Sequence, residues 1–193
     1  AVNCGDEGLV DLLLEKGASL RDDPDILFTA MDRGRYGIFR ALAGRGADVN
    51  GRNRDGEPIL VHALRSAANY PEQRETHLRY AAVLLDNGAD VNLPGKDRDT
   101  ALILALRCGS EDIISRVRKK TRELKAKGLH DRTALMMAAK HGYLSLVRDL
   151  VEEGADVNGR DSFGWAPVMF SATAEITAYL ESKGGTTGTV NAV

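Results

Sequence analysis

A five-residue segment recurs in this chain and constrains its fold more than any other feature. The sequence Gly-Ala-Asp-Val-Asn occurs at residues 46–50, 88–92 and 154–158, and a weaker copy, Gly-Ala-Ser-Leu, occupies residues 17–20. Each copy follows a run of helix formers. Glycine readily adopts the left-handed conformation that ends a helix, and Asp and Asn favour turns by hydrogen-bonding nearby backbone. Each copy therefore predicts a helix end followed by a turn.

The spacing of the copies indicates a repeated pair of helices. Gly88 and Gly154 are 66 residues apart, which is two periods of 33, and the Thr-Ala-Leu segments that begin at Thr100 and Thr133 are also 33 residues apart. A period near 33 residues with a turn and two helices is the signature of ankyrin repeats. The chain therefore resembles the ankyrin-repeat family over nearly its whole length. The resemblance implies an all-α fold, an ankyrin-repeat α-solenoid of about six helix-turn-helix units with β-hairpin fingers.

The helix ends and starts divide the expected array into repeats. We place them within a single array, residues 1–185, at 1–20, 21–50, 51–92, 93–127, 128–158 and 159–185, with a flexible tail at 186–193. The second repeat is short around residues 22–24, where we expect only a stub of a finger. The third has extra residues between its helices, around 66–75, and Pro71 is expected to open or precede its outer helix.

The fourth repeat departs furthest from the pattern, because its helix stop is absent. Thr121 stands where a glycine is expected, and Arg118 occupies a position that is apolar in other repeats. We expect the outer helix to extend to about Lys125, with a distorted turn before Gly128. The second half of this helix and the turn after it carry a basic patch, made of Arg116, Arg118, Lys119, Lys120, Arg122, Lys125 and Lys127. This basic helix, residues 116–127, is either a solvated face or a dock for nucleic acid or phospholipid.

A second basic feature lies on the inner helices. Arg65, Arg107 and Lys140 occupy the same position near the end of three consecutive inner helices. They either complement the helix dipole or pair with acidic side chains of a partner. In the last finger, Phe163 and Trp165 either pack along the neighbouring finger or anchor a partner. The partner-binding residues that we predict are Arg54, Arg65, Arg107, His130, Arg132, Lys140, Phe163 and Trp165.

A small residue recurs at one position of five inner helices. The residues at this position are Ala30, Ala63, Ala105, Ala138 and Ser171. A small side chain there lets neighbouring inner helices approach closely, so we expect these residues to lie between helices without spare room.

Catalytic and metal-binding motifs are absent from the sequence. The histidines, His62, His77, His130 and His141, and the cysteines, Cys4 and Cys108, form none of the common zinc, nucleophile or phosphate-loop patterns. Cys108 and His141 fall in adjacent repeats with backbones roughly 10 Å apart, whereas a Cys–His nucleophile pair needs contact at about 3 Å. We therefore expect no cofactor, no metal and no enzyme, and an enzyme that uses Cys108 is only a third hypothesis.

Charge and composition bear on nucleic-acid binding, membrane insertion and the cellular compartment. The formal net charge of −2 argues against general nucleic-acid binding, and no apolar run approaches the roughly 18–20 residues that span a bilayer. Cys4 and Cys108 lie three repeats apart, too far for a disulfide, and unpaired thiols favour a reducing compartment. We expect a monomeric cytoplasmic module that binds another protein, with an acidic segment, through its concave inner-helix face and finger loops. The alternative is an anionic-ligand dock on the basic helix.

Overall fold

The computed structural model describes residues 25–188, together with residues 8, 10, 12, 15, 16 and 20. The chain divides into two compact units, Ala1–Lys96 and Asp97–Val193, which we call the N-terminal and the C-terminal unit. Most of the predicted first repeat, the finger stub at residues 22–24 and the end of the tail lie outside the described residues. A single array over residues 1–185 stays a prediction.

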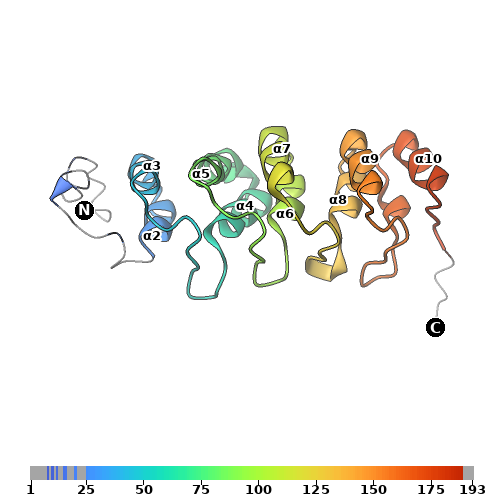
Figure 1. The fold of residues 1–193 in the computed structure, drawn as a ribbon, viewed down its shortest axis with the longest axis horizontal. Coiled ribbons are helices and arrows are strands. Elements are labelled where there is room, and N and C mark those ends of the chain that lie inside the picture. The colour runs from blue at the N-terminus through green and yellow to red at the C-terminus, as the bar shows by residue number, and fades with distance from the viewer. Residues whose placement is uncertain are drawn as a thin grey trace. The chain divides into compact units, whose positions relative to one another are not determined.

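Two stacked helix pairs make up the N-terminal unit over the residues from 25 onward (Figure 1). In chain order its elements are α2 (Ile26–Asp32), α3 (Tyr36–Gly44), α4 (Ile59–Asn69), the 3-10 turn η1 (Pro71–Gln73) and α5 (Arg74–Asp86). Pro71 begins η1 and so precedes the outer helix, as its fixed φ predicts. The rings of Phe39 and Tyr80, both fully buried with centroids 4.8 Å apart, join α3 to α5 in the core.

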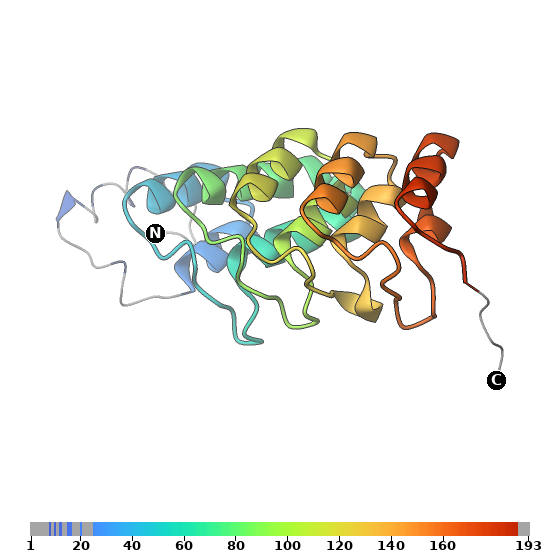
Figure 2. The ribbon, with the colours of Figure 1, turned by 45° about the vertical axis from the view of Figure 1, so that its right-hand side comes forward.

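The C-terminal unit repeats the same arrangement (Figures 1 and 2). Its elements are α6 (Ala101–Cys108), α7 (Glu111–Lys120), η2 (Leu129–Asp131), α8 (Ala134–Lys140), α9 (Leu144–Glu152), η3 (Pro167–Phe170) and α10 (Ala174–Ser182). Thr133 caps α8, because its hydroxyl accepts a hydrogen bond from the Met136 N–H at 3.3 Å. In the last repeat the short 3-10 turn η3 takes the place of an inner α-helix.

The recurrent five-residue segment ends helices as predicted and also joins neighbouring repeats. Gly46, Gly88 and Gly154 have φ values of 90°, 87° and 88°, the left-handed conformation that closes a helix. Within each copy, the Asp carboxylate accepts a hydrogen bond from the N–H of the Asn two residues later, at 2.9 Å. The Asn50 side chain then accepts the Asp90 N–H at 2.8 Å. The segment therefore ties one repeat to the next through its Asn.

The prediction of a long basic helix is wrong beyond Lys120. α7 ends there, and Thr121 adopts an extended conformation with φ −73° and ψ 127°. The Thr121 hydroxyl donates a hydrogen bond to the Val117 carbonyl at 2.9 Å, which satisfies one of the carbonyls left open at the helix end. Residues 121–127 form an irregular connection instead, because Thr121 ends the helix without the expected glycine.

Helices are the regular secondary structure of the described residues, and β-structure is limited there to two isolated bridges. Arg52 pairs with Pro58 and Lys127 with Thr133, each across the base of a loop that precedes an inner helix. Over the described residues, stacked helix pairs without a sheet are the all-α arrangement that the resemblance implies. The four predicted alanines, Ala30, Ala63, Ala105 and Ala138, are all 0% exposed, as the packing prediction requires. The prediction is wrong for Ser171, which follows the 3-10 turn η3 instead of lying on an inner helix and is partly exposed.

Candidate functional site

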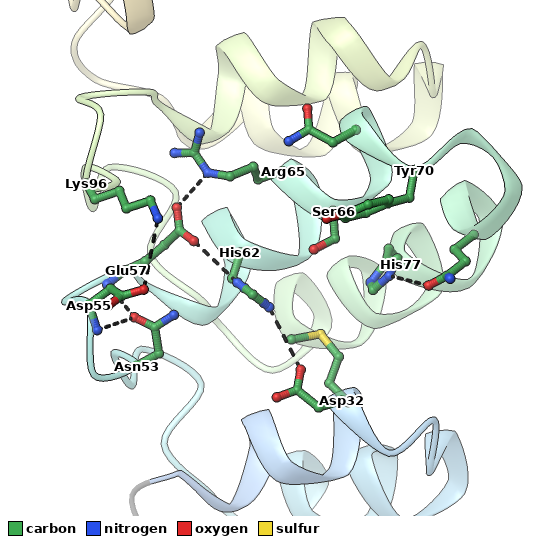
Figure 3. Close-up of a pocket in the computed structure, with 13 residues that line it drawn as sticks. Asp32, Asn53, Asp55, Glu57, His62, Arg65, Ser66, Tyr70, His77 and Lys96 are labelled. Carbon is green, nitrogen blue, oxygen red and sulfur yellow. Dashed lines mark hydrogen bonds and ion pairs between the residues drawn. The ribbon is translucent and has the colours of Figure 1, made fainter.

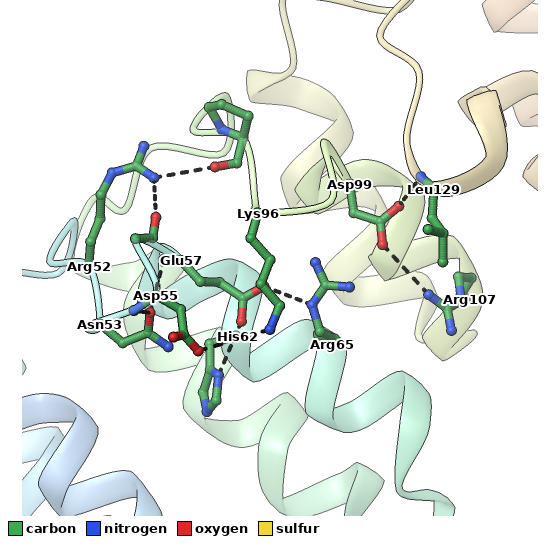
Figure 4. Close-up of polar contacts among 12 residues, drawn as sticks. Arg52, Asn53, Asp55, Glu57, His62, Arg65, Lys96, Asp99, Arg107 and Leu129 are labelled. Atoms are coloured by element: carbon green, nitrogen blue, oxygen red, sulfur yellow. Dashed lines mark hydrogen bonds and ion pairs between the residues drawn. The ribbon is translucent and has the colours of Figure 1, made fainter.

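The first member of the predicted basic row is neutralised within its own repeat. In the N-terminal unit the Arg65 Nε donates a hydrogen bond to the Glu57 Oε1 at 2.7 Å (Figure 4). The Arg65 side chain is 15% exposed and that of Glu57 is 4% exposed. Glu57 is positioned by the preceding finger, where its N–H donates to the Asn53 side chain at 3.0 Å. Arg65 therefore holds the finger against α4.

The second member of the row has the same kind of partner. In the C-terminal unit the Arg107 guanidinium lies 3.8 Å from the Asp99 carboxylate, which is 2% exposed. Asp99 also accepts the Leu129 N–H at 2.9 Å (Figure 4). The backbone approaches so closely there that a Cβ at Gly128 would lie 2.4 Å from the Asp99 Oδ1. Glycine is therefore required at residue 128, and Asp99 joins two successive fingers.

These buried acids escaped the sequence analysis, although a signal for them exists. Glu57 and Asp99 each stand eight residues before the arginine that they pair with. Two equal spacings in consecutive repeats mark an acid–base pair that closes each finger onto its inner helix. Arg65 and Arg107 remain predicted binding residues.

Lys140 is the member of the row that lacks such an acid. The residue eight positions before it is Arg132, so the charge of the acidic position is reversed in this repeat. Lys140 is the last residue of α8 and is exposed. Over the part of the chain that the structure describes, no ion pair is formed by Lys140. The Lys140 ammonium is therefore available to a ligand.

Arg132 faces a buried acid of the next finger. Its Nε lies 3.5 Å from the Asp161 Oδ2, and the Asp161 side chain is 0% exposed. The other oxygen of Asp161 accepts the N–H groups of Phe163 and Trp165, both at 2.9 Å. One carboxylate thus fixes the backbone that carries two aromatic side chains.

These aromatic side chains are exposed although their backbone is held. Phe163 is 56% exposed, Trp165 is 45% exposed, and Leu129 on the neighbouring finger is 44% exposed. The ring of His130 lies 5.3 Å from that of Phe163, and the Ser162 N–H donates to the His130 carbonyl at 2.9 Å. The two loops lie side by side in both views of the ribbon (Figures 1 and 2). They form an apolar surface in the C-terminal unit.

Burial and neighbouring positive charge act on His141 at the end of α8. His141 directly follows α8, and burial lowers its pKa, with further lowering by the Lys140 ammonium and the Arg107 guanidinium. Like charges disfavour the protonated imidazole. The exposed Lys140 ammonium therefore places positive charge at the end of α8.

The alternative anionic patch is partly neutralised and is not one helical face. Arg116 lies 3.5 Å from the Asp112 carboxylate, and Arg118 forms an ion pair with Glu153. Lys119 and Lys120 are exposed at the end of α7. The remaining predicted members, Arg122, Lys125 and Lys127, lie in the irregular connection after the helix.

A polar groove in the N-terminal unit was not predicted. Its volume is about 430 Å³, and it lies between the ends of α2 and α4 and the loop before α4 (Figure 3). The side chains that define it are Asp32, Asp55, His62, Tyr70, His77 and Lys96. The predicted residue Arg54 is exposed and lines an adjoining hollow. Burial lowers the pKa of His77, and the neighbouring His62 lowers it further.

The burial of Cys108 gives little support to the hypothesis that this residue is a catalytic nucleophile. Cys108 is 3% exposed at the end of α6, whereas a reactive thiolate needs access to its substrate. Within the described part of the chain, no three His, Cys, Asp or Glu side chains are grouped as a metal site requires. Among the described helices, none is long and apolar enough to cross a membrane.

Stacked helix pairs joined by a recurrent turn define a helical repeat protein, and comparisons with known proteins specify which kind. Residues 73–161 match the family model of ankyrin repeats (3 copies). The chain is also 29% identical over 131 residues, 67% of its length, to Neurogenic locus notch homolog protein 1 of Xenopus tropicalis. Residues 73–161 therefore carry ankyrin repeats. It matches about 5% of the length of the Xenopus protein, so the similarity concerns one segment of that protein.

Proposed function

We propose that this chain is a non-catalytic module that binds a partner protein through the finger surface of the C-terminal unit. We define the finger surface as His130, Arg132, Lys140, Phe163 and Trp165. Ankyrin repeats are in general protein-interaction modules, and one observation supports this surface as the binding face. Phe163 and Trp165 are exposed while Asp161 holds their backbone. Aromatic anchors held in place before binding lose little conformational entropy when a partner docks.

The charges around these anchors define the partner that we propose. Lys140 is exposed, whereas the Arg132 side chain, 29% exposed beside the Phe170 ring, is paired with Asp161 and adds positive charge only at its exposed part. A partner segment with acidic side chains and one apolar anchor would match the cations and the aromatic rings together. Charge at the rim of an interface mainly sets the association rate, whereas a buried aromatic sets the residence time.

A capture experiment with three variants tests this proposal. Partners captured from the native cell by the unaltered chain are identified by mass spectrometry, and their binding kinetics are then measured. Trp165→Ala should speed dissociation and weaken binding about thirtyfold, the equivalent of roughly 2 kcal/mol. Lys140→Glu should slow association. Lys119→Glu, which reverses an exposed lysine on the outer helix α7, serves as the matched control. If only the control variant loses binding, an anionic dock on α7 replaces the proposal.

The number of repeats, the oligomeric state and the cellular location are part of the same proposal. We propose that six repeats with β-hairpin fingers form one array over residues 1–185, that the array binds as a monomer, and that it acts in the cytoplasm. The two bridged loops and the repeat ties support the array. Light scattering of the purified chain, with and without partner, tests the monomeric state.

A further inference from the structure

We propose that Leu129 is a second apolar anchor for the partner, and that the partner binds as an extended segment across two neighbouring fingers of the C-terminal unit. Leu129 is 44% exposed on the finger that precedes α8, and Phe163 and Trp165 stand on the finger that precedes η3. This inference deepens the proposed function and rests on it in one respect, that the finger surface binds a protein. It adds a residue that the finger surface does not contain and a conformation for the bound segment.

One backbone hydrogen bond joins the two fingers beside these apolar residues. The Ser162 N–H donates to the His130 carbonyl at 2.9 Å. Leu129 is the residue before this carbonyl group, and Phe163 is the residue after this N–H group. The ring of His130 also lies 5.3 Å from that of Phe163. The two exposed apolar residues therefore stand on backbones that are fixed to each other before a partner binds.

The finger that carries Leu129 holds an unfavourable backbone conformation. His130 and Asp131 have φ values of 59° and 57°, in the left-handed region that residues with a side chain seldom adopt. Such residues persist only where the surrounding structure holds them, and they gather at ligand-binding positions. Two in succession beside an exposed leucine favour a binding role for this finger.

Polar contacts hold the finger in this conformation. The buried Asp99 carboxylate accepts the Leu129 N–H at 2.9 Å (Figure 4). The Asp131 N–H donates to the Gly128 carbonyl at 3.0 Å, and the Arg98 Nη2 lies 3.1 Å from the Asp131 Oδ1. These contacts fix the Leu129 backbone and leave the residue exposed. An apolar side chain on a held backbone loses little conformational entropy when a partner covers it.

The spacing of the repeats indicates the conformation of the bound segment. Neighbouring helices pack roughly 8–10 Å apart, and an extended chain advances about 3.1–3.4 Å per residue, so a segment that crosses two fingers would place two apolar side chains about three residues apart. Lys140 ends α8, the inner helix of the repeat that begins with the finger of Leu129, and its exposed ammonium favours acidic side chains in the same segment.

Peptide selection followed by a titration tests the inference. The probe is a phage-displayed library of random dodecapeptides, selected on the unaltered chain. The selected peptides should carry two apolar residues about three positions apart together with acidic residues. In a fluorescence-anisotropy titration with a synthetic copy of such a peptide, Leu129→Ala should weaken binding about tenfold, as expected when an apolar anchor is removed. Leu129→Met keeps an apolar side chain of similar volume and should bind nearly as the unaltered chain does.

Leu124→Ala is the matched control for this titration. Leu124 is a partly exposed leucine of the same unit, in the irregular connection outside the fingers, and its variant should bind like the unaltered chain. Circular dichroism checks that each variant is folded at the temperature of the titration. Selection of no peptide, or equal effects of Leu129→Ala and Leu124→Ala, would overturn the inference.

The captured partner separates this inference from the proposed function. A partner that is weakened by Trp165→Ala but tolerates Leu129→Ala would support the finger surface and refute the second anchor. A partner that tolerates both substitutions would refute the finger surface itself.

Discussion

At the scale of single residues, buried carboxylates determine which cations remain available to a ligand. Arg65 and Arg107 share a repeat position with Lys140, and the sequence alone makes the three look equivalent. Glu57 and Asp99 neutralise the first two. The positions of the three basic residues were predictable, because they recur with the period of the repeat. Their ion pairs with buried acids were not predictable, because these pairs depend on how each finger folds back onto its helix.

Lys140→Glu provides a direct test of the charge at this site. The Lys140 ammonium helps to lower the pKa of His141 after burial, so reversing that charge should favour the protonated imidazole. We expect the His141 pKa to rise in the variant, and an NMR titration of the imidazole measures it. Lys119→Glu should leave the His141 pKa unchanged. A His141 pKa that does not respond to the change at residue 140 would show that the Lys140 ammonium does not lie near the His141 imidazole.

Asp161 offers a second test at this scale, because one carboxylate holds both aromatic residues of the last finger. Asp161→Ala removes the acceptor for two N–H groups and leaves Arg132 without its acid. We expect a loss of about 2–4 kcal/mol in the free energy of unfolding. Asp161→Asn keeps an acceptor oxygen and should cost less. Trp165 is the only tryptophan, so its fluorescence reports unfolding and finger mobility together. Equal stability of both variants would contradict this role.

At the scale of elements, the helix ends were predictable and the irregular repeats were not. The three Gly-Ala-Asp-Val-Asn copies end α3, α5 and α9 because backbone conformation and local hydrogen bonds suffice to specify them. The end of α7 depends on a threonine that the periodic pattern does not single out. Likewise, η3 replaces an inner helix where Pro167 and a short connection leave too few residues for one.

Hydrogen exchange should reveal α7 as the weak element of the C-terminal unit. Stability in repeat arrays is nearly a sum of repeat and interface terms, and α7 lacks a glycine stop. We expect the amides of residues 117–120, the last turn of α7, to exchange faster than those of residues 149–152 in α9. Residues 121–127 should exchange faster still. Slower exchange in α7 than in α9 would contradict this ranking.

The packing of the inner helices predicts a cost for larger side chains. Ala138 is 0% exposed on α8, which packs against α6, α9 and η3. Ala138→Leu should therefore lower the free energy of unfolding by about 1–3 kcal/mol through overpacking. Ala178→Leu, on the exposed face of α10 in the same unit, is the control and should change stability little. An unchanged denaturation midpoint for Ala138→Leu would mean that the helices do not meet at this residue.

At the scale of the whole molecule, the family was readable from the repeat but the binding surface was not. Phe163 and Trp165 were candidates from their place in a finger, and their exposure distinguishes them from packed aromatics such as Tyr80, which is 1% exposed. The repeat position also reveals opposite charges in the two units, Asp32 in one and Lys140 in the other. Lys140 lacks the buried acid partner of Arg65 and Arg107, so we expect the partner to carry acidic side chains at this position.

Photo-crosslinking tests the central claim, that the finger surface binds the partner, most directly. p-Benzoyl-phenylalanine replaces Trp165 in one variant and Lys119 in another, which places the same aromatic photo-crosslinker on the last finger or on the outer helix α7. Irradiation in the native cell should join the partner to the variant altered at residue 165 and leave the variant altered at residue 119 without it. Crosslinking from residue 119 alone would contradict the account and transfer the interaction to the outer-helix face.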